Sequence, residues 1–100
     1  MPATLSDVLS FAEKATATKL YPGNKLEVEE LTKRFRLVMV SSGDARSAYG
    51  FVDKATGDIF KSASWAVPAK GVRGNVFSDN ATDCCQQFSI VYNTPGRRKG

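Results

Sequence analysis

The feature that most constrains the fold is a chain reversal in the middle of the sequence. Residues 51–53 have the composition of a strand end, residues 58–60 that of a strand start, and the four residues 54–57 lie between them. A connection of this length is usually built around a type I turn, and Gly57 can adopt the positive φ that closes it. The Asp53 side chain can accept hydrogen bonds from the turn amides. The sequence therefore predicts a β-hairpin.

The segment after the hairpin, residues 62–77, is basic and contains two glycines. Lys70 and Arg73 lie between Trp65 and Phe77. A platform for single-stranded nucleic acid uses cations for the phosphates and flat aromatic faces for the bases, so this composition fits such a platform. It also fits an ordinary loop that Trp65 anchors to the core while the cations stay in solvent, and for the segment taken alone this is the simpler interpretation. The sequence leaves both interpretations open.

A block of short motifs runs through residues 51–75. An aromatic-Val-Asp strand is followed by Thr-Gly-Asp, Ser-Trp, Pro-Ala-Lys and Arg-Gly-Asn, in that order. The order resembles a pattern carried by small uncharacterised proteins of bacteriophages and environmental viral sequences. The resemblance implies a viral origin, a short domain and no established activity. The matching positions are Phe51, Asp53, Thr56, Gly57, Asp58, Lys61, Ser64, Trp65, Pro68, Ala69, Lys70, Arg73, Gly74 and Asn75.

The length and composition indicate one globular domain. One hundred residues allow a single modest core, and 42% hydrophobic with 24% charged residues are ordinary globular values. No apolar run reaches the length of a membrane span, and the N-terminus lacks the layout of a signal peptide. We therefore expect a domain over residues 1–93, a flexible basic tail over residues 94–100, no membrane partner and a cytoplasmic location, in the host cell for a phage protein.

The net charge of +4 is distributed unevenly along the chain. Residues 1–32 carry a net charge of −2, residues 33–73 carry +5, residues 74–96 carry −2, and the tail adds +3. Because the clustering of charge matters more than its sum, the basic middle of the chain is the informative feature.

The N-terminal region predicts one amphipathic helix. Thr4 can act as the N-cap, with the Asp7 carboxylate three residues on as the second half of a capping box. Lys19 and the Pro-Gly pair at 22–23 are helix stop signals. The apolar stripe expected to cover a sheet comprises Leu5, Val8, Leu9, Ala12, Ala15 and Thr16.

The central region predicts successive strands. Residues 33–41 alternate with a period of two and are rich in β-branched side chains, which is typical of a strand. Residues 48–53 follow as a second strand, with Tyr49 and Phe51 expected on one face. Residues 24–31 fit a strand or a helix equally well.

The predicted meander can leave one sheet face open to water. Arg34 and Arg36 share that face, and neighbouring strands could bring Arg46 and Lys61 towards it. Convergence of these cations would form a basic surface with an aromatic rim. The other interpretation is an ordinary solvated face, on which scattered cations protect the sheet from aggregation.

Residues 84–92 predict a final strand after a polar loop. Cys84 and Cys85 are adjacent, without the two-residue gap of a zinc-binding or redox pair, and no other cysteine is present. On a strand they would point to opposite faces and act as small hydrophobic residues, as expected in a reducing compartment.

The composition argues against an enzyme. The chain has no histidine, so it lacks the usual general base and the Ser-His and Cys-His nucleophile pairs. In a strand Glu27 and Glu29 would share a face and could hold a magnesium ion. The sequence offers no third acid to complete such a site, so a solvated strand face is the simpler explanation. We expect no catalytic residue, no metal and no cofactor.

The sequence therefore predicts an α+β domain in which an N-terminal amphipathic helix packs on an antiparallel meander sheet of about four strands. The first functional hypothesis is a phage-type accessory protein that binds single-stranded DNA or RNA non-specifically. The alternative is a non-enzymatic module that uses the same loop and sheet edge to form a homo-oligomer or bind a protein. The expected contacts are Arg34, Arg36, Lys61, Lys70 and Arg73 for phosphates and Trp65, Phe77 or Tyr49 for bases.

Overall fold

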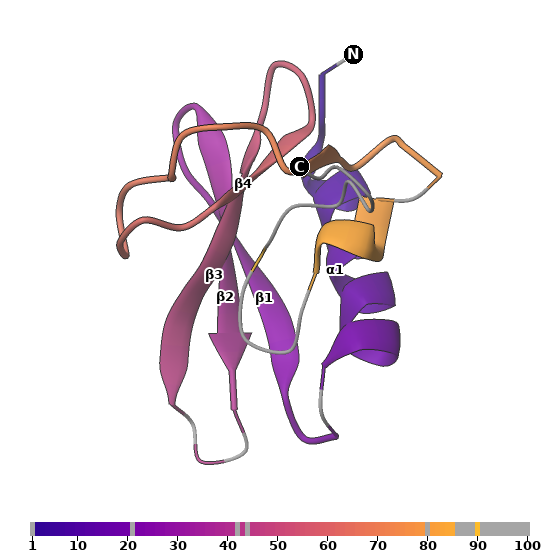
Figure 1. Ribbon diagram of the computed structural model, residues 1–100, viewed down its shortest axis with the longest axis vertical. Coiled ribbons are helices and arrows are strands. Elements are labelled where there is room, and N and C mark those ends of the chain that lie inside the picture. The colour runs from indigo at the N-terminus through magenta and orange to yellow at the C-terminus, as the bar shows by residue number, and fades with distance from the viewer. Residues whose placement is uncertain are drawn as a thin grey trace, which may run out of the picture.

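The computed structural model describes residues 2–20, 22–41, 43, 45–79, 81–85 and 90. Within them the predicted α+β class is confirmed: one helix packs on an open antiparallel sheet of five strands in the order β1-β2-β3-β4-β5. Figure 1 shows α1 on one side of the strands and the long loop after β4 reaching to the other. The elements are α1 (Leu5–Lys19), β1 (Lys25–Glu30), β2 (Arg34–Val40), β3 (Arg46–Asp53), β4 (Asp58–Lys61), β5 (Gly74–Asn75) and the 3-10 helix η1 (Ala81–Cys84).

Helix α1 begins with the predicted capping box. The Asp7 amide donates to Thr4 Oγ1, and the Thr4 amide donates to Asp7 Oδ2 at 2.9 Å. These bonds satisfy helix N-terminal donors and place the negative charge in the first turn. No helix in the described part of the chain is long and apolar enough to cross a membrane.

The predicted apolar stripe of α1 is partly wrong. Leu5 and Leu9 are exposed, whereas Phe11, which the stripe left out, is buried with Val8 and Ala15. The helix contacts both β1 and η1, so its buried face is turned towards the chain segment that returns after β5. The periodicity of α1 alone could not indicate that second contact.

The ambiguous region 24–31 forms strand β1, which pairs antiparallel with β2. Leu26 lies opposite Met39 and Val28 opposite Leu37, and these side chains face α1. Thr16 Oγ1 of the helix accepts a hydrogen bond from the Leu26 amide at 3.1 Å. This bond satisfies one edge donor of β1 and fixes the helix against the sheet.

A register shift between β2 and β3 places Tyr49 and Phe51 on opposite faces, so the prediction that they share one is wrong. Leu37 pairs with Gly50 and Val38 with Ala48, which leaves Tyr49 as the extra residue. Tyr49 is fully buried beneath α1, while Phe51 pairs with Arg36 on the other face. An inserted residue reverses the alternation of a strand.

The predicted hairpin at 54–57 is confirmed. The Gly57 amide donates to the Asp53 carbonyl at 2.8 Å, and Gly57 has φ +80°. The Ala55 amide donates to Asp53 Oδ1 at 2.7 Å, as expected for an aspartate that begins a turn.

The prediction of a strand over residues 84–92 is wrong where the chain is described. Cys84 ends the 3-10 helix η1, and Cys85 forms an antiparallel bridge with Ile90. Because Cys85 and Ile90 pair with each other, they cannot belong to one continuous strand. Both cysteines are fully buried in one core cluster rather than divided between two faces. The predicted tail, residues 94–100, lies outside the described residues.

Replacing Gly57 by alanine should destabilise the protein more than replacing Gly71. Both glycines have positive φ, which costs an L-residue about 1–2 kcal/mol. A Cβ at Gly57 would lie 2.7 Å from Phe77 Cε2, whereas a Cβ at Gly71 would meet no atom within 4 Å. Overpacking adds about 1–3 kcal/mol. Urea unfolding of Gly57→Ala and Gly71→Ala measures the difference, and equal losses would contradict the close packing of Phe77 on the turn.

Candidate binding surface on the loop after β4

The sheet face that points away from α1 carries an alternating set of charges. Arg36 lies opposite Glu29 in the β1:β2 pair, and its Nη1 bonds Glu29 Oε1. Arg46 Nη1 lies 2.7 Å from Glu27 Oε1 and its Nη2 lies 3.6 Å from Glu29 Oε2. Lys25 completes the series at 3.7 Å from Glu27. Arg36 and Arg46 on this face are therefore paired with carboxylates of β1.

This arrangement bears on the sequence hypothesis of a basic sheet surface. Arg34, Arg36 and Arg46 lie on this face, but Lys61 pairs with Gly50 and so belongs to the face that carries α1. Phe51 is fully buried, and the Arg34 guanidinium lies 6.0 Å from the centre of its ring. The face is therefore covered around Phe51, while Arg46 and Glu27 farther along it stay partly exposed.

The cover comes from the chain after β4. Ser62 forms an antiparallel bridge with Pro68, and the Ala63 amide donates to the Val67 carbonyl at 2.9 Å, so the chain turns back on itself around Trp65. The Ser62 hydroxyl donates to the Ala48 carbonyl at 2.9 Å. These bonds tie the loop to β3.

Trp65 is held in place by Arg36. The Arg36 guanidinium carbon lies 4.6 Å from the centre of the indole, and Arg36 Nε donates to the Trp65 carbonyl at 2.8 Å. The Arg36 side chain is only 12% exposed, because Glu29 and Trp65 enclose it. The guanidinium thus fixes the tryptophan backbone and ring together.

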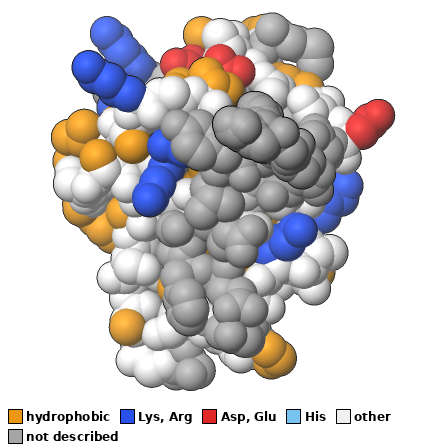
Figure 2. Space-filling model, viewed as in Figure 1, with side chains coloured by type: hydrophobic (Ala, Val, Ile, Leu, Met, Phe, Trp, Pro, Cys, Tyr) orange, Lys and Arg blue, Asp and Glu red, His pale blue; other side chains and the backbone are white. Residues whose placement is uncertain are grey.

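Trp65 nevertheless keeps much of its surface in solvent. It is 45% exposed, and nearby in the chain Val67 and Val72 are 54% and 52% exposed. Figure 2 shows hydrophobic side chains gathered at the left edge, where Figure 1 places this loop. We call residues 62–73 the Trp65 loop. An exposed apolar group held rigidly at a protein edge is typical of a contact surface.

Exposed cations lie beside this apolar surface. Lys61 and Lys70 are both exposed, and the Ala69 amide donates to the Lys61 carbonyl at 2.7 Å, which brings the two lysine positions to the same part of the loop. Arg73 is half-buried at the loop base, where its amide donates to the Ile59 carbonyl. The Trp65 loop therefore combines an exposed aromatic side chain with the accessible charge of Lys70, and Lys61 at the end of β4 directly precedes the loop.

The far end of the loop is held by Asn75. Its Nδ2 donates to the Thr56 carbonyl at 3.0 Å and to Asp58 Oδ1 at 2.9 Å, and its Oδ1 accepts from the Phe77 amide. The Val76 amide donates to the Gly57 carbonyl. The Thr-Gly-Asp and Arg-Gly-Asn motifs therefore contact each other, and their role in this structure is to close the loop.

The other two aromatic residues proposed to stack on bases lie elsewhere. Tyr49 is fully buried under α1. Phe77 is half-buried and packs on the turn glycine Gly57. Of the three aromatics, Trp65 is the one that the structure places at the surface.

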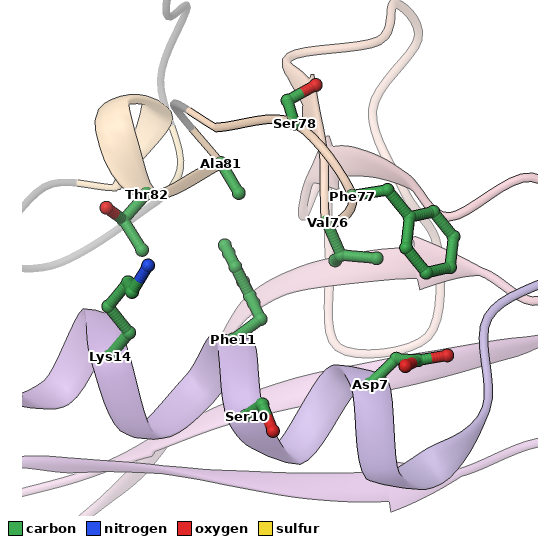
Figure 3. Close-up of a pocket in the computed structure, with 9 residues that line it drawn as sticks. All are labelled: Asp7, Ser10, Phe11, Lys14, Val76, Phe77, Ser78, Ala81 and Thr82. Carbon is green, nitrogen blue, oxygen red and sulfur yellow. The ribbon is translucent and has the colours of Figure 1, made fainter.

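Phe77 also borders a pocket between α1 and residues 76–82. Its volume is about 200 Å³. Figure 3 shows Phe11 pointing from the helix between the two walls, with Lys14 and Thr82 at one end and Asp7 and Phe77 at the other. The pocket is formed by elements different from those of the Trp65 loop.

The described residues contain no group of three or more potential metal-binding side chains. Glu27 and Glu29 do share a face, as a strand requires, but both are engaged by cations. Hydrogen bonding to Cys84 and burial raise the pKa of the Cys85 thiol, which keeps it protonated.

Several of these features could not be found in the sequence. The ion pairs of Glu27 and Glu29 could not be predicted because residues 24–31 had no assigned conformation. Once β1 is a strand, Glu29 lies opposite Arg36 of β2, and Arg46 of β3 reaches Glu27. The exposure of Val67 and Val72 has no signal in the sequence, where both are ordinary apolar residues of a loop. The pocket is lined by residues about seventy positions apart in the chain, and a local sequence pattern cannot predict such a contact.

The fold defines a small α+β protein in which the exposed Trp65 lies on a loop that also carries the exposed Lys70. A family model described as "Family of unknown function (DUF7717)" matches residues 5–90. The chain belongs to this family. No curated protein and no solved structure matches it.

The ion pairs of β1 should make the free energy of unfolding depend on pH in the acidic range. The hydrogen bond from Arg46, aided by the Arg46 and Lys25 charges, lowers the pKa of Glu27 below its ordinary 4.5. A lowered folded-state pKa stabilises the protein above the unfolded value, and this contribution disappears as the pH falls through the folded value. Glu27→Gln should therefore flatten the decline in unfolding free energy below pH 4.5.

Urea unfolding at several pH values measures this effect. Glu13→Gln is the matched control, because Glu13 is exposed on α1 and takes part in none of the ion pairs among the described residues. An unchanged pH profile in Glu27→Gln would show that the pair with Arg46 is too well solvated to matter.

Proposed function

We propose that the protein is a non-enzymatic binding protein that takes up single-stranded nucleic acid on the Trp65 loop. The observation that carries the proposal is the half-exposed indole of Trp65, which Arg36 holds at 4.6 Å. A base can stack on an exposed indole without regard to sequence. Because Arg36 already restrains the ring, little side-chain freedom is lost on binding.

The neighbouring charges fit the phosphate backbone of such a strand. Lys70 is exposed on the Trp65 loop, and the exposed Lys61 ends β4, where its carbonyl accepts a hydrogen bond from the Ala69 amide of the loop, so both can contact a backbone whose base stacks on the indole. Arg36 is assigned to positioning Trp65, since its guanidinium is occupied by Glu29 and by the indole. The motif resemblance to bacteriophage proteins supports an accessory role in a virus.

The test is fluorescence anisotropy of a labelled single-stranded oligonucleotide over a salt series. Trp65→Ala should weaken binding by roughly 5- to 150-fold, the factor that loss of one stacked base represents. Lys61→Gln/Lys70→Gln should reduce the slope of log affinity against log salt by about 1.4, since each phosphate contact contributes about 0.7.

Two control variants make this result specific. Lys25→Gln/Lys33→Gln removes the same charge from exposed positions outside the loop and should leave the salt slope nearly unchanged. Arg97→Gln/Arg98→Gln/Lys99→Gln removes the charge of the chain end within the full-length protein. Binding that disappears only in this last variant would contradict the assignment to the Trp65 loop, as would undetectable binding at low salt.

A second candidate function is association through the same surface, with a second copy or with another protein. Exposure of Val67 and Val72 beside Trp65 favours it, because apolar side chains add little to phosphate recognition but much to a protein contact. Sedimentation equilibrium should then show a mass that rises with concentration and falls back to the monomer in Val67→Ser/Val72→Ser. A monomer at every concentration would exclude self-association.

A further inference from the structure

We propose that the pocket between α1 and residues 76–82 is a second binding site, for a small carboxylic acid with an apolar body. This site shares no residue with the Trp65 loop and does not depend on nucleic-acid binding. Its volume of about 200 Å³ corresponds to roughly seven water molecules at about 30 Å³ each. That volume suits a ligand of about ring size with a short polar arm, smaller than a typical drug molecule.

The floor of the pocket is apolar and rigid. Phe11 is 4% exposed and Ala81 is 8% exposed, and Val76 and Phe77 form the facing wall. Val76 and Phe77 are fixed by the Asn75 and Gly57 contacts, so the wall exists before any ligand arrives. A preformed apolar floor favours the burial of a hydrocarbon group.

The charged side chains at the two ends of the pocket determine the orientation of a bound ligand. Lys14 lies at the end beside Thr82, and Asp7 lies at the other end, about 10 Å away along the helix axis by seven residues of rise. Asp7 Oδ2 accepts hydrogen bonds from the Thr4 amide and hydroxyl at 2.9 and 3.0 Å. Its negative charge is thus committed to the helix cap and repels a second anion.

Lys14 is the available charge. None of the ion pairs among the described residues involves it. A carboxylate at the Lys14 end satisfies this ammonium and can accept a hydrogen bond from the Thr82 hydroxyl, while the apolar body lies on Phe11 and Phe77. The reverse orientation places the carboxylate against Asp7. Charge and shape together therefore select an apolar monocarboxylate bound in one direction.

The test uses phenylacetate as the probe, added to the ¹⁵N-labelled full-length protein and followed by amide chemical shifts. The expected result is a saturable set of shift changes confined to residues 7–14 and 76–82. Lys14→Met keeps the length and apolar stem of the side chain and should weaken binding about five-fold, the upper range for an exposed ion pair. Lys25→Met, at an exposed position outside the pocket, should leave binding unchanged.

Two further measurements separate this site from non-specific association. Phenylacetamide has the same shape without the charge and should bind about five-fold more weakly to the native protein, with no further loss in Lys14→Met. Ser10→Leu places a larger apolar group in the lining while keeping Lys14, and it should abolish the shifts with the fold intact by circular dichroism.

Equal affinity for the acid and the amide would overturn carboxylate recognition. Shift changes that do not saturate, or that spread outside the two segments, would overturn the site itself. Neither result bears on the Trp65 loop, because oligonucleotide binding is measured with other variants.

Discussion

The hydrogen bonds of Asn75 are the interaction on which both proposed surfaces depend. One side chain joins the Thr56 carbonyl, the Asp58 carboxylate and the Phe77 amide, and it does so at the point where the chain returns from a long excursion. On one side of Asn75 the returning chain closes the Trp65 loop. On the other side it presents Val76 and Phe77 to α1. This arrangement requires glycine at position 57, because a side chain there would occupy the place of the Phe77 ring.

The uneven charge of the sequence acquires a structural explanation. The acidic first third of the chain supplies Glu27, Glu29 and Glu30, and the basic middle supplies their partners Arg46, Arg36 and Lys54. A cluster of basic residues is the electrostatic feature expected of a nucleic-acid-binding chain. In this protein the sheet lets β1 form ion pairs with Arg36 of β2, with Arg46 of β3 and with Lys54, which follows β3. On or next to the Trp65 loop, the exposed positive charges left for a partner are Lys61 and Lys70.

This pairing also changes the role of the most promising arginine. In the sequence Arg36 is a candidate phosphate contact, whereas in the structure its guanidinium connects Glu29 on β1 to the indole of Trp65. Arg36 therefore fixes Trp65 relative to the sheet. The exposed indole is consequently as fixed as the strand beneath it, a useful property for any surface that must present one aromatic ring in one orientation.

The sequence by itself determined the elements whose signals are local: the capping box at Thr4 and Asp7, the turn closed by Gly57, the alternation of β2 and hence the α+β class. These features depend on residues within a few positions of one another, where propensity and periodicity act. Tertiary structure alone decided the conformation of β1, the bulge at Tyr49 that places Phe51 on the opposite face and the rotation of α1 towards Phe11. It also placed Cys84 at the end of a 3-10 helix, where the sequence predicted the start of the last strand. It also decided the site, since Arg36 and Trp65, like Lys14 and Thr82, meet only through packing of segments distant in sequence. Burial and charge pairing between such segments outweigh the local preference for helix or strand. A periodic pattern along the chain cannot predict these long-range contacts.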